Sequence, residues 1–163
     1  MPVPVFAQTH TTVHDHFFPS LAAFSGSTKP TSTIVGEMVT AEAARLYGAL
    51  AAVSVSASTI STDAGTTYPA AYAWCQDTVR LGAAIRVMQA IAGAGAVPKA
   101  WTEELEKRYK LLEEKGYLAL GDAPSPSESV SGPRSHVTVH DLDTGDEADM
   151  STAEPKFRRD DSL

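Results

Sequence analysis

Apolar residues recur every three or four positions in three long segments of the chain, which is the spacing of one face of an α-helix. In the first segment the apolar positions are Ile34, Val35, Met38, Val39, Leu46, Ala49, Leu50 and Val53. The side chain of Thr31 or Ser32 can cap this helix, and Pro30 restricts the direction in which the chain enters it. We predict a helix over roughly residues 32–56 that frays in the β-branched, Ser-rich stretch VSVSASTIST and gives way to a loop.

The other two segments predict two more long helices. One begins near Pro69, a residue suited to a first helical turn, and its apolar stripe consists of Trp74, Leu81, Ile85, Met88 and Ala92. The glycines and the proline of GAGAVP end it. In the other helix the apolar positions are Trp101, Leu105, Tyr109 and Leu112, and Gly116 takes the left-handed position that closes a helix. These stripes predict the core of a helical bundle.

Shorter elements flank the long helices. TTVHDHFFPSL predicts about two turns of helix that start with Thr11 or Thr12 as the cap and stop before Pro19. YLAL, directly after Gly116, predicts either a short strand or a segment that packs back on the bundle. The expected fold class is therefore all-α, a small bundle of three main helices plus a short N-terminal helix.

The composition changes after Leu120. GDAPSPSESVSGPRS has too little apolar surface to offset the entropy lost on ordering its backbone, so it predicts a linker. In HVTVH, Val137 and Val139 alternate with polar residues as in a strand. We therefore divide the chain into a helical body, residues 1–120, and an extended polar C-terminal arm, residues 121–163, which can contain a short strand or hairpin.

Charge follows the same division. Of the formal net charge of −7, residues 1–120 carry −1, from 10 acidic and 9 basic side chains, and residues 121–163 carry −6, from 10 acidic and 4 basic ones. A near-neutral body without a basic stripe argues against a free-standing nucleic-acid binder. The start of the chain lacks the pattern of a secretion signal, and no apolar run is long enough to span a membrane, so we expect a soluble, cytosolic chain.

Five histidines raise the question of a metal site. His10 and His14 are four residues apart, which suits two ligands on one helix face, and the others are His16, His136 and His140. No glutamate follows in a zinc-protease arrangement, which favours solvated or capping histidines over ligands. DLDTGDEAD resembles a calcium loop, but Asp146 and Thr152 stand where that loop needs a glycine and a glutamate. We predict no metal site.

Catalytic patterns are equally weak. Cys75 is the single cysteine, which excludes an intrachain disulfide, and it has no neighbouring base in sequence. No serine stands in a G-x-S-x-G turn, and GAGAV lacks the third glycine and the preceding strand of a dinucleotide-binding motif. A helix-turn-helix is disfavoured because EELEK puts carboxylates where base-reading residues would stand. We predict neither an enzyme nor a bound cofactor.

The order of these features resembles one known family. A short helix leads into a Phe-rich, Ser-containing loop, FFPSLAAFSGSTKPTSTIV, and a T-K-P-T step opens the amphipathic helix MVTAEAARLYGAL. An Ala-rich helix follows, then a charged helix with a glycine cap, RYKLLEEKGYLALGD, and a polar tail with PKF and arginines. The chain is similar in this order to the head-to-tail adaptor, or connector, proteins of long-tailed bacteriophages. The resemblance spans the whole chain and is most specific over residues 17–50 and 105–120.

This resemblance implies a structural virion protein located in the viral neck, at the head–tail interface, and assembled in the host cytoplasm. It implies a homo-oligomeric, twelve-fold ring that docks under the portal protein, extends the DNA channel and joins the head to the next neck or tail component. DNA only passes through such a channel, and a near-neutral body suits this because a basic lining would hold the phosphates. No membrane contact is expected.

The C-terminal arm is the part that the resemblance assigns to portal binding. Phe157 can fill a pocket while Arg158 and Arg159, with Lys156, make charge-assisted pairs to a partner. Val137 and Val139 can pair edge-on with a neighbouring subunit. These are the candidate interaction residues. The alternative function, from a different class, is an intracellular helical regulator, antitoxin-like or DNA-associated, with a disordered partner-binding tail.

Overall fold

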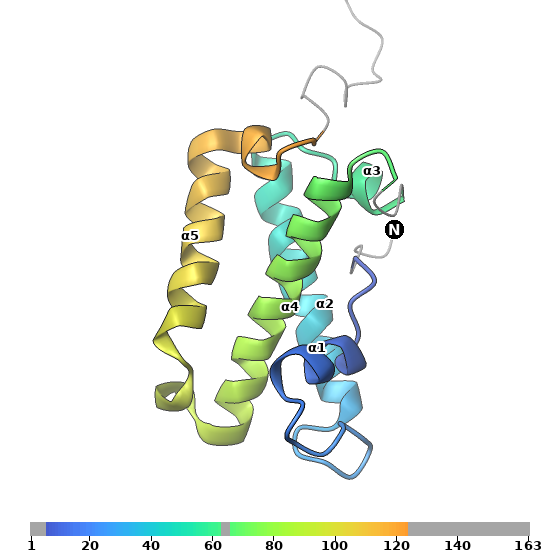
Figure 1. The fold of residues 1–163 in the computed structure, drawn as a ribbon, viewed down its shortest axis with the longest axis vertical. Helices are drawn as coiled ribbons and strands as arrows, with labels where there is room; N and C mark the ends of the chain where they lie inside the picture. Colours follow the sequence, from blue (N-terminus) through green and yellow to red (C-terminus); the bar gives the residue numbers. More distant parts are fainter. Residues whose placement is uncertain (1–5, 63–65, 124–163) are drawn as a thin grey trace, which may run out of the picture. The chain divides into compact units, whose positions relative to one another are not determined.

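The structure, a computed structural model, describes residues 6–62 and 66–123. Its elements follow in the order α1 (His10–Phe17), α2 (Ser32–Ala52), α3 (Ala57–Thr62), α4 (Pro69–Ala92), the 3₁₀ turn η1 (Ala94–Ala96), α5 (Lys99–Lys115) and the 3₁₀ turn η2 (Gly116–Leu120) (Figure 1). These two ranges contain helices and no strand, which confirms the predicted all-α fold for them.

Helix α4 is the central helix of the body. It packs against α2, α5 and α1, and α2 and α5 also contact each other. Figure 1 shows α4 running in the opposite direction to α2 and α5. The core between these helices is made of side chains that are at most 2% exposed, among them Val35, Val39, Leu46, Leu50, Val79, Val87 and Leu112.

The first two helices begin with threonine caps. The side chain of Thr9 accepts a hydrogen bond from the backbone N–H of Thr12, while Thr12 Oγ1 accepts one from the N–H of Thr9. The cap of α1 is therefore Thr9 rather than the predicted Thr11 or Thr12, because this reciprocal pair satisfies two N–H groups at once. Helix α1 ends at Phe17, before Pro19 as predicted, and Thr31 caps α2 through the N–H of Ile34.

Helix α2 ends at Ala52, earlier than the predicted residue 56. Ser54 has a φ of 60°, which breaks the helix, and the chain then turns so that Val55 is buried. The side chain of Ser56 accepts a hydrogen bond from the N–H of Thr59, at the start of the separate helix α3. The Ser-rich stretch thus forms a second short helix that the sequence pattern did not predict, because it depends on one left-handed residue and one new cap.

Helix α4 begins at Pro69 as predicted and ends before Gly93, whose φ is 85°. Its buried surface is wider than the predicted stripe, since it includes Cys75, Thr78, Val79, Ala83 and Val87, while Ala92 is exposed. The physical reason is that α4 has packed neighbours on several sides, so more than one face is withdrawn from water. Within the described ranges, no helix is long and apolar enough to cross a membrane.

The end of α5 leads the chain back onto the body. Gly116 has a φ of 58°, the positive value predicted for the residue that closes the helix. The YLAL segment then forms η2 rather than a strand, and Leu120 is buried. Asp122 Oδ2 and Oδ1 accept hydrogen bonds from the N–H groups of Ala70 and Ala71, at 2.9 and 2.7 Å. This carboxylate caps the start of α4, which has no cap of its own.

A cluster of aromatic rings connects the α1 region to the start of α5. The rings of Phe17 and Phe18 meet that of Trp101 with centroids 4.9 and 6.2 Å apart, both edge to face. Phe24, in the loop after α1, packs on Phe18 at 6.0 Å and on the ring of His14 at 5.6 Å. Edge-to-face pairs of this kind add to the stability supplied by buried area, so the buried rings of Phe18 and Phe24 attach the Phe-rich loop to the core.

Candidate functional site

A buried carboxylate lies where the three long helices meet. Glu42 exposes 1% of its side chain and comes from the face of α2 that also carries Val39 and Leu46. Charged side chains are almost never buried to this degree unless they are paired. The partners of Glu42 therefore determine what this site can do.

Three donors surround the Glu42 carboxylate. Oε1 accepts hydrogen bonds from Arg45 Nη1 at 3.3 Å and from the Tyr109 hydroxyl at 3.1 Å. Oε2 accepts one from Arg86 Nε at 3.0 Å. Each long helix contributes at least one of these groups, because Arg45 belongs to α2, Arg86 to α4 and Tyr109 to α5. The carboxylate is therefore fully engaged and acts as an electrostatic crosslink between the helices.

Gly82 provides the space that this carboxylate occupies. A Cβ atom built at position 82 would overlap Glu42 Cγ and Cδ and would lie 2.6 Å from Oε1. Such separations do not occur between real side chains, so the α4 backbone can approach Glu42 this closely only with glycine.

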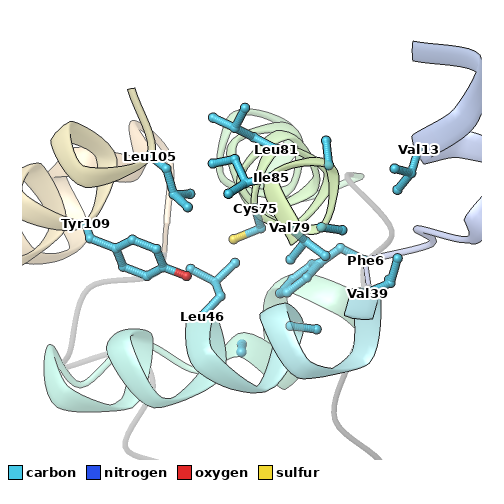
Figure 2. Close-up of a cluster of buried hydrophobic side chains, with 14 of the residues drawn as sticks. Phe6, Val13, Val39, Leu46, Cys75, Val79, Leu81, Ile85, Leu105 and Tyr109 are labelled. Carbon is cyan, nitrogen blue, oxygen red and sulfur yellow. The ribbon is translucent and has the colours of Figure 1, made fainter. Parts of the chain in front are cut away.

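Tyr109 reaches the carboxylate from α5. Figure 2 shows its ring extending from α5 toward the space between α2 and α4, with the hydroxyl at its tip. Burial raises the pKa of the Tyr109 hydroxyl, and the negative charge of Glu42 raises this pKa further. The hydroxyl consequently stays protonated and donates to Glu42. The guanidinium of Arg45 lies 4.3 Å from the centre of the same ring, a cation–π arrangement.

A cavity of about 310 Å³ adjoins this cluster. Its lining residues come from the three long helices and are Glu42, Arg45, Gly82, Ile85, Arg86, Gln89 and Leu105. Ile85 and Leu105 are each 7% exposed and supply apolar walls. Arg45 and Arg86 have 52% and 41% of their side chains exposed, so both guanidiniums can contact a molecule in the cavity while they hold Glu42.

The charges lining the cavity sum to about +1, since two arginines face one carboxylate. Each arginine uses one nitrogen on Glu42, which leaves further N–H donors for another acceptor. A cavity of this composition can bind a carboxylate or another oxyanion through charge-assisted hydrogen bonds. Both oxygens of Glu42 already accept hydrogen bonds from the three donors.

The remaining groups with reactive side chains are placed less favourably. Cys75 is fully buried, and burial raises the pKa of its thiol to about 12, so the thiol stays protonated. His14, one of the candidate metal ligands of the sequence, is engaged on both ring nitrogens, with Asp15 Oδ1 at 2.9 Å and the carbonyl oxygen of Leu21 at 3.0 Å. Within residues 6–62 and 66–123, no three His, Cys, Asp or Glu side chains converge as a metal site would require.

The interaction residues inferred from the sequence lie outside the described residues: Val137, Val139, Lys156, Phe157, Arg158 and Arg159. Of the residues that the structure brings together, Ile85, Leu105 and Tyr109 were predicted only as apolar core positions, and Glu42 and Arg45 were not singled out from the sequence. One signal was present, because Glu42 follows Val39 by three positions and precedes Leu46 by four, which places a charge on an apolar stripe. Its partners Arg86 and Tyr109 are 44 and 67 positions away, beyond any local pattern.

Comparisons of the chain with protein-family models, with curated proteins and with solved structures find no match.

Proposed function

We propose that this chain is a head-to-tail adaptor of a long-tailed bacteriophage, a structural protein of the virion neck. The observation that carries the proposal is the order of features along the chain: a short helix, a Phe-rich loop, a T-K-P-T step into an amphipathic helix, an Ala-rich helix and a charged helix closed by glycine. In the proposed role, twelve copies form a ring that docks under the portal, extends the DNA channel and presents a surface to the next neck or tail protein.

The phenylalanines of the Phe-rich loop support this proposal because they pack against the body. Phe18 and Phe24 are buried, and the T-K-P-T step places Thr31 as the cap of α2. Several residues in the most specific stretch of the resemblance therefore have a structural role in this fold. A helical body of this kind is what the resemblance implies.

The outer face of α2 provides a second line of support, for a contact between subunits. Helix α2 has 21 residues and only three charged ones, Glu37, Glu42 and Arg45, of which Glu42 is buried. Its exposed positions include Thr40, Ala44, Tyr47, Gly48 and Ala51. A helix face that is meant for water usually carries more charge, and small residues allow a neighbouring helix to approach closely. This face suits a neighbouring copy of the chain in a ring.

The first test is association with the portal protein encoded in the same genome. The full-length chain and the portal are mixed, and the product is examined by native mass spectrometry and electron microscopy. A ring of adaptor subunits on the portal is expected, even where the chain alone stays monomeric. A chain that stays monomeric or dimeric beside the portal, and leaves the portal unchanged, would instead favour the helical regulator.

The second test concerns the outer face of α2. Ala44→Glu adds a charge there and is expected to prevent ring formation on the portal. Ala100→Glu, the same change at an exposed position of α5, is the matched control and should assemble like the wild type. Both variants are first compared with the wild type by circular dichroism. Equal assembly of Ala44→Glu and Ala100→Glu would exclude this face as the subunit contact.

The third test concerns the C-terminal arm. Deletion of residues 153–163 is expected to abolish portal binding, and Phe157→Ala and the double change Arg158→Ala/Arg159→Ala are expected to weaken it at least tenfold. Asp160→Asn/Asp161→Asn is the control in the same segment. Portal binding that is unaffected by the deletion would rule out the arm as the portal-binding element. Replacement of Val137 and Val139 by Asp tests the proposed strand pairing, with ring stability in salt as the readout.

A further inference from the structure

The cavity beside Glu42 is lined by hydrogen-bond donors that the described residues leave without an acceptor. Arg45 and Arg86 each donate to Glu42 through one nitrogen, and within residues 6–62 and 66–123 neither guanidinium donates to another group. A guanidinium has five N–H groups, so each arginine keeps several of them for a further acceptor. Because both arginines line the cavity, a ligand there can reach donors from α2 and from α4 at once.

Contacts within the body hold both guanidiniums in place before a ligand binds. Glu42, with 1% of its side chain exposed, pairs with both of them, and the guanidinium of Arg45 also lies 4.3 Å from the centre of the Tyr109 ring. This stacking covers a face of the guanidinium, whereas its N–H groups lie in its plane. Donors that are already ordered lose less entropy when they bind an acceptor, which favours binding at this cavity.

The lining of the cavity restricts the kind of anion. Its charged residues are Glu42, Arg45 and Arg86, so one positive charge is left over, which matches a single negative charge on the ligand. Glu42 would repel the second charge of a dianion. Ile85 and Leu105 offer apolar contact to methylene groups, which an inorganic anion lacks. The volume of about 310 Å³ is at the lower end of the range for ligand sites, so the ligand is small.

We propose that this cavity binds one carboxylate group on a short aliphatic chain, with Arg45 and Arg86 as the donors to the carboxylate and Ile85 and Leu105 as the contacts of the chain. Two sources carry this chemistry: a free organic acid and the aspartate or glutamate side chain of another protein. The exposed amide of Gln89, on the cavity wall, offers a donor and an acceptor to the remaining polar atoms of either ligand.

The first experiment titrates the full-length chain with butyrate and with butyramide, an uncharged molecule of nearly the same shape. Binding is followed by NMR, through the backbone amides and the Nε–H groups of the arginines, at neutral pH and constant ionic strength. Butyrate is expected to shift the signals of Arg86 Nε–H and of the Gln89 side chain to saturation, and to bind at least about tenfold more tightly than butyramide. Equal binding of the two probes, or shifts confined to other parts of the chain, would overturn the proposal.

Inorganic phosphate is the probe that separates a carboxylate site from a general anion site. It carries charge without methylene groups, so it is expected to bind at least about threefold more weakly than butyrate under the same conditions. Phosphate that shifts the same signals and binds more tightly than butyrate would overturn the assignment to a carboxylate.

The second experiment changes the cavity without removing a partner of Glu42. Gln89 is exposed, and Gln89→Glu puts a carboxylate on the cavity wall that repels a second anion; it is expected to weaken butyrate binding at least about threefold. Ala90→Glu is the matched control, because Ala90 is exposed on the same helix and does not line the cavity. Both variants are first compared with the wild type by circular dichroism. Equal effects of the two changes on butyrate binding would overturn the assignment to this cavity.

The third experiment distinguishes the two sources of the carboxylate. The probe is glutamate with an acetylated amino group and an amidated α-carboxyl group, which presents its side chain as a protein would, and the glutamine analogue is its uncharged control. If the blocked glutamate binds at least as tightly as butyrate, the cavity takes a side chain of another protein. If it binds at least about tenfold more weakly than butyrate, the cavity takes a free organic acid. None of these measurements involves the portal, so this inference and the proposed function can fail independently.

Discussion

Gly82 and Glu42 fit together as a pair across the interface between α4 and α2. The carboxylate of Glu42 occupies the volume that a Cβ at position 82 would need, and Oε1 would lie 2.6 Å from such a Cβ. A glycine is therefore required at position 82 because the Glu42 side chain fills the space of a Cβ, and not because of the backbone dihedral angles at this position. This relationship positions the buried carboxylate against Arg86 and Tyr109, and with it one wall of the cavity.

Gly82→Ala is expected to destabilise the protein by about 3 kcal/mol, the middle of a range of about 1.5–5 kcal/mol. Alanine favours a helix over glycine by about 1 kcal/mol, but overpacking a core costs about 1–3 kcal/mol, and the hydrogen bonds of a displaced charged group cost about 1.5–3 kcal/mol. The measurement is urea unfolding followed by circular dichroism. Gly48→Ala is the control: nothing lies within 4 Å of a Cβ placed at position 48, so this change should stabilise the protein by about 0.5–1 kcal/mol. Stabilisation by both changes would contradict the close fit of Gly82 and Glu42.

Tyr109→Phe removes the hydroxyl that donates to Glu42 and keeps the ring beneath Arg45. We expect a loss of about 1.5–3 kcal/mol in the free energy of unfolding, the range for a hydrogen bond to a charged group. Tyr47→Phe, at a 42% exposed tyrosine, should change it by less than about 0.5 kcal/mol. A double-mutant cycle of Tyr109→Phe with Glu42→Gln should give a coupling of about 1 kcal/mol. Strict additivity would mean that the two groups do not interact in solution.

Asp122→Ala removes the acceptor for the N–H groups of Ala70 and Ala71. Loss of a helix cap costs about 1 kcal/mol, and an amide hydrogen-exchange experiment should show faster exchange in the first turn of α4. Asp77→Ala, which removes an exposed carboxylate near Arg80, is the control and should cost less than about 1 kcal/mol. Unchanged protection at Ala70 and Ala71 would show that Asp122 does not hold the start of this helix.

His14 should make the stability of the body depend on pH. Its two ring nitrogens face acceptors, Asp15 Oδ1 and the Leu21 carbonyl, and a neutral imidazole can donate to only one of them. The hydrogen bond to Asp15 is the largest cause of a pKa raised above 6.5, followed by the one to Leu21. Because the folded-state pKa is the higher one, the stabilisation is complete below pH 6.5 and is lost as the pH rises through the folded-state value.

The pH dependence of His14 is measured by urea unfolding between pH 5.5 and 8.5 and by the NMR titration of the ring protons. The urea midpoint of the wild type should fall across the upper part of this range. In His14→Phe the urea midpoint should decrease less with rising pH. His16→Gln, in the same helix, is the control and should show the same decrease as the wild type. A His14 resonance that titrates below pH 6.5 would contradict the hydrogen-bond pattern.

Cys75 should be unreactive toward thiol reagents in the native protein. A pKa of about 12 leaves almost no thiolate at pH 8, and the side chain is fully buried in α4. Ellman's reagent is expected to modify the thiol only as fast as the protein opens, and one equivalent should react at once in 6 M guanidinium chloride. Rapid stoichiometric modification without denaturant would mean that α4 does not protect this residue.

Local signals in the sequence predicted the main helices well. Thr31 caps α2, Pro69 opens α4 and Gly116 closes α5, each as expected. These features depend on the backbone preferences of single residues and their nearest neighbours, which the order of amino acids displays directly. The cap of α1 and the early end of α2 were predicted wrongly, because neighbouring Ser and Thr residues offer several competing caps and only one is used.

An all-α body with three long amphipathic helices could be predicted from the order of amino acids, since the apolar period of three to four residues is a property of the chain alone. The burial of Glu42, in contrast, depends on how the helices pack against each other. A carboxylate can leave water only if donors replace its hydration. Arg45 is a local donor, but Arg86, Tyr109 and the space at Gly82 come from helices that are distant in sequence. The cavity beside Glu42 has the same origin, because it exists only where α2, α4 and α5 meet.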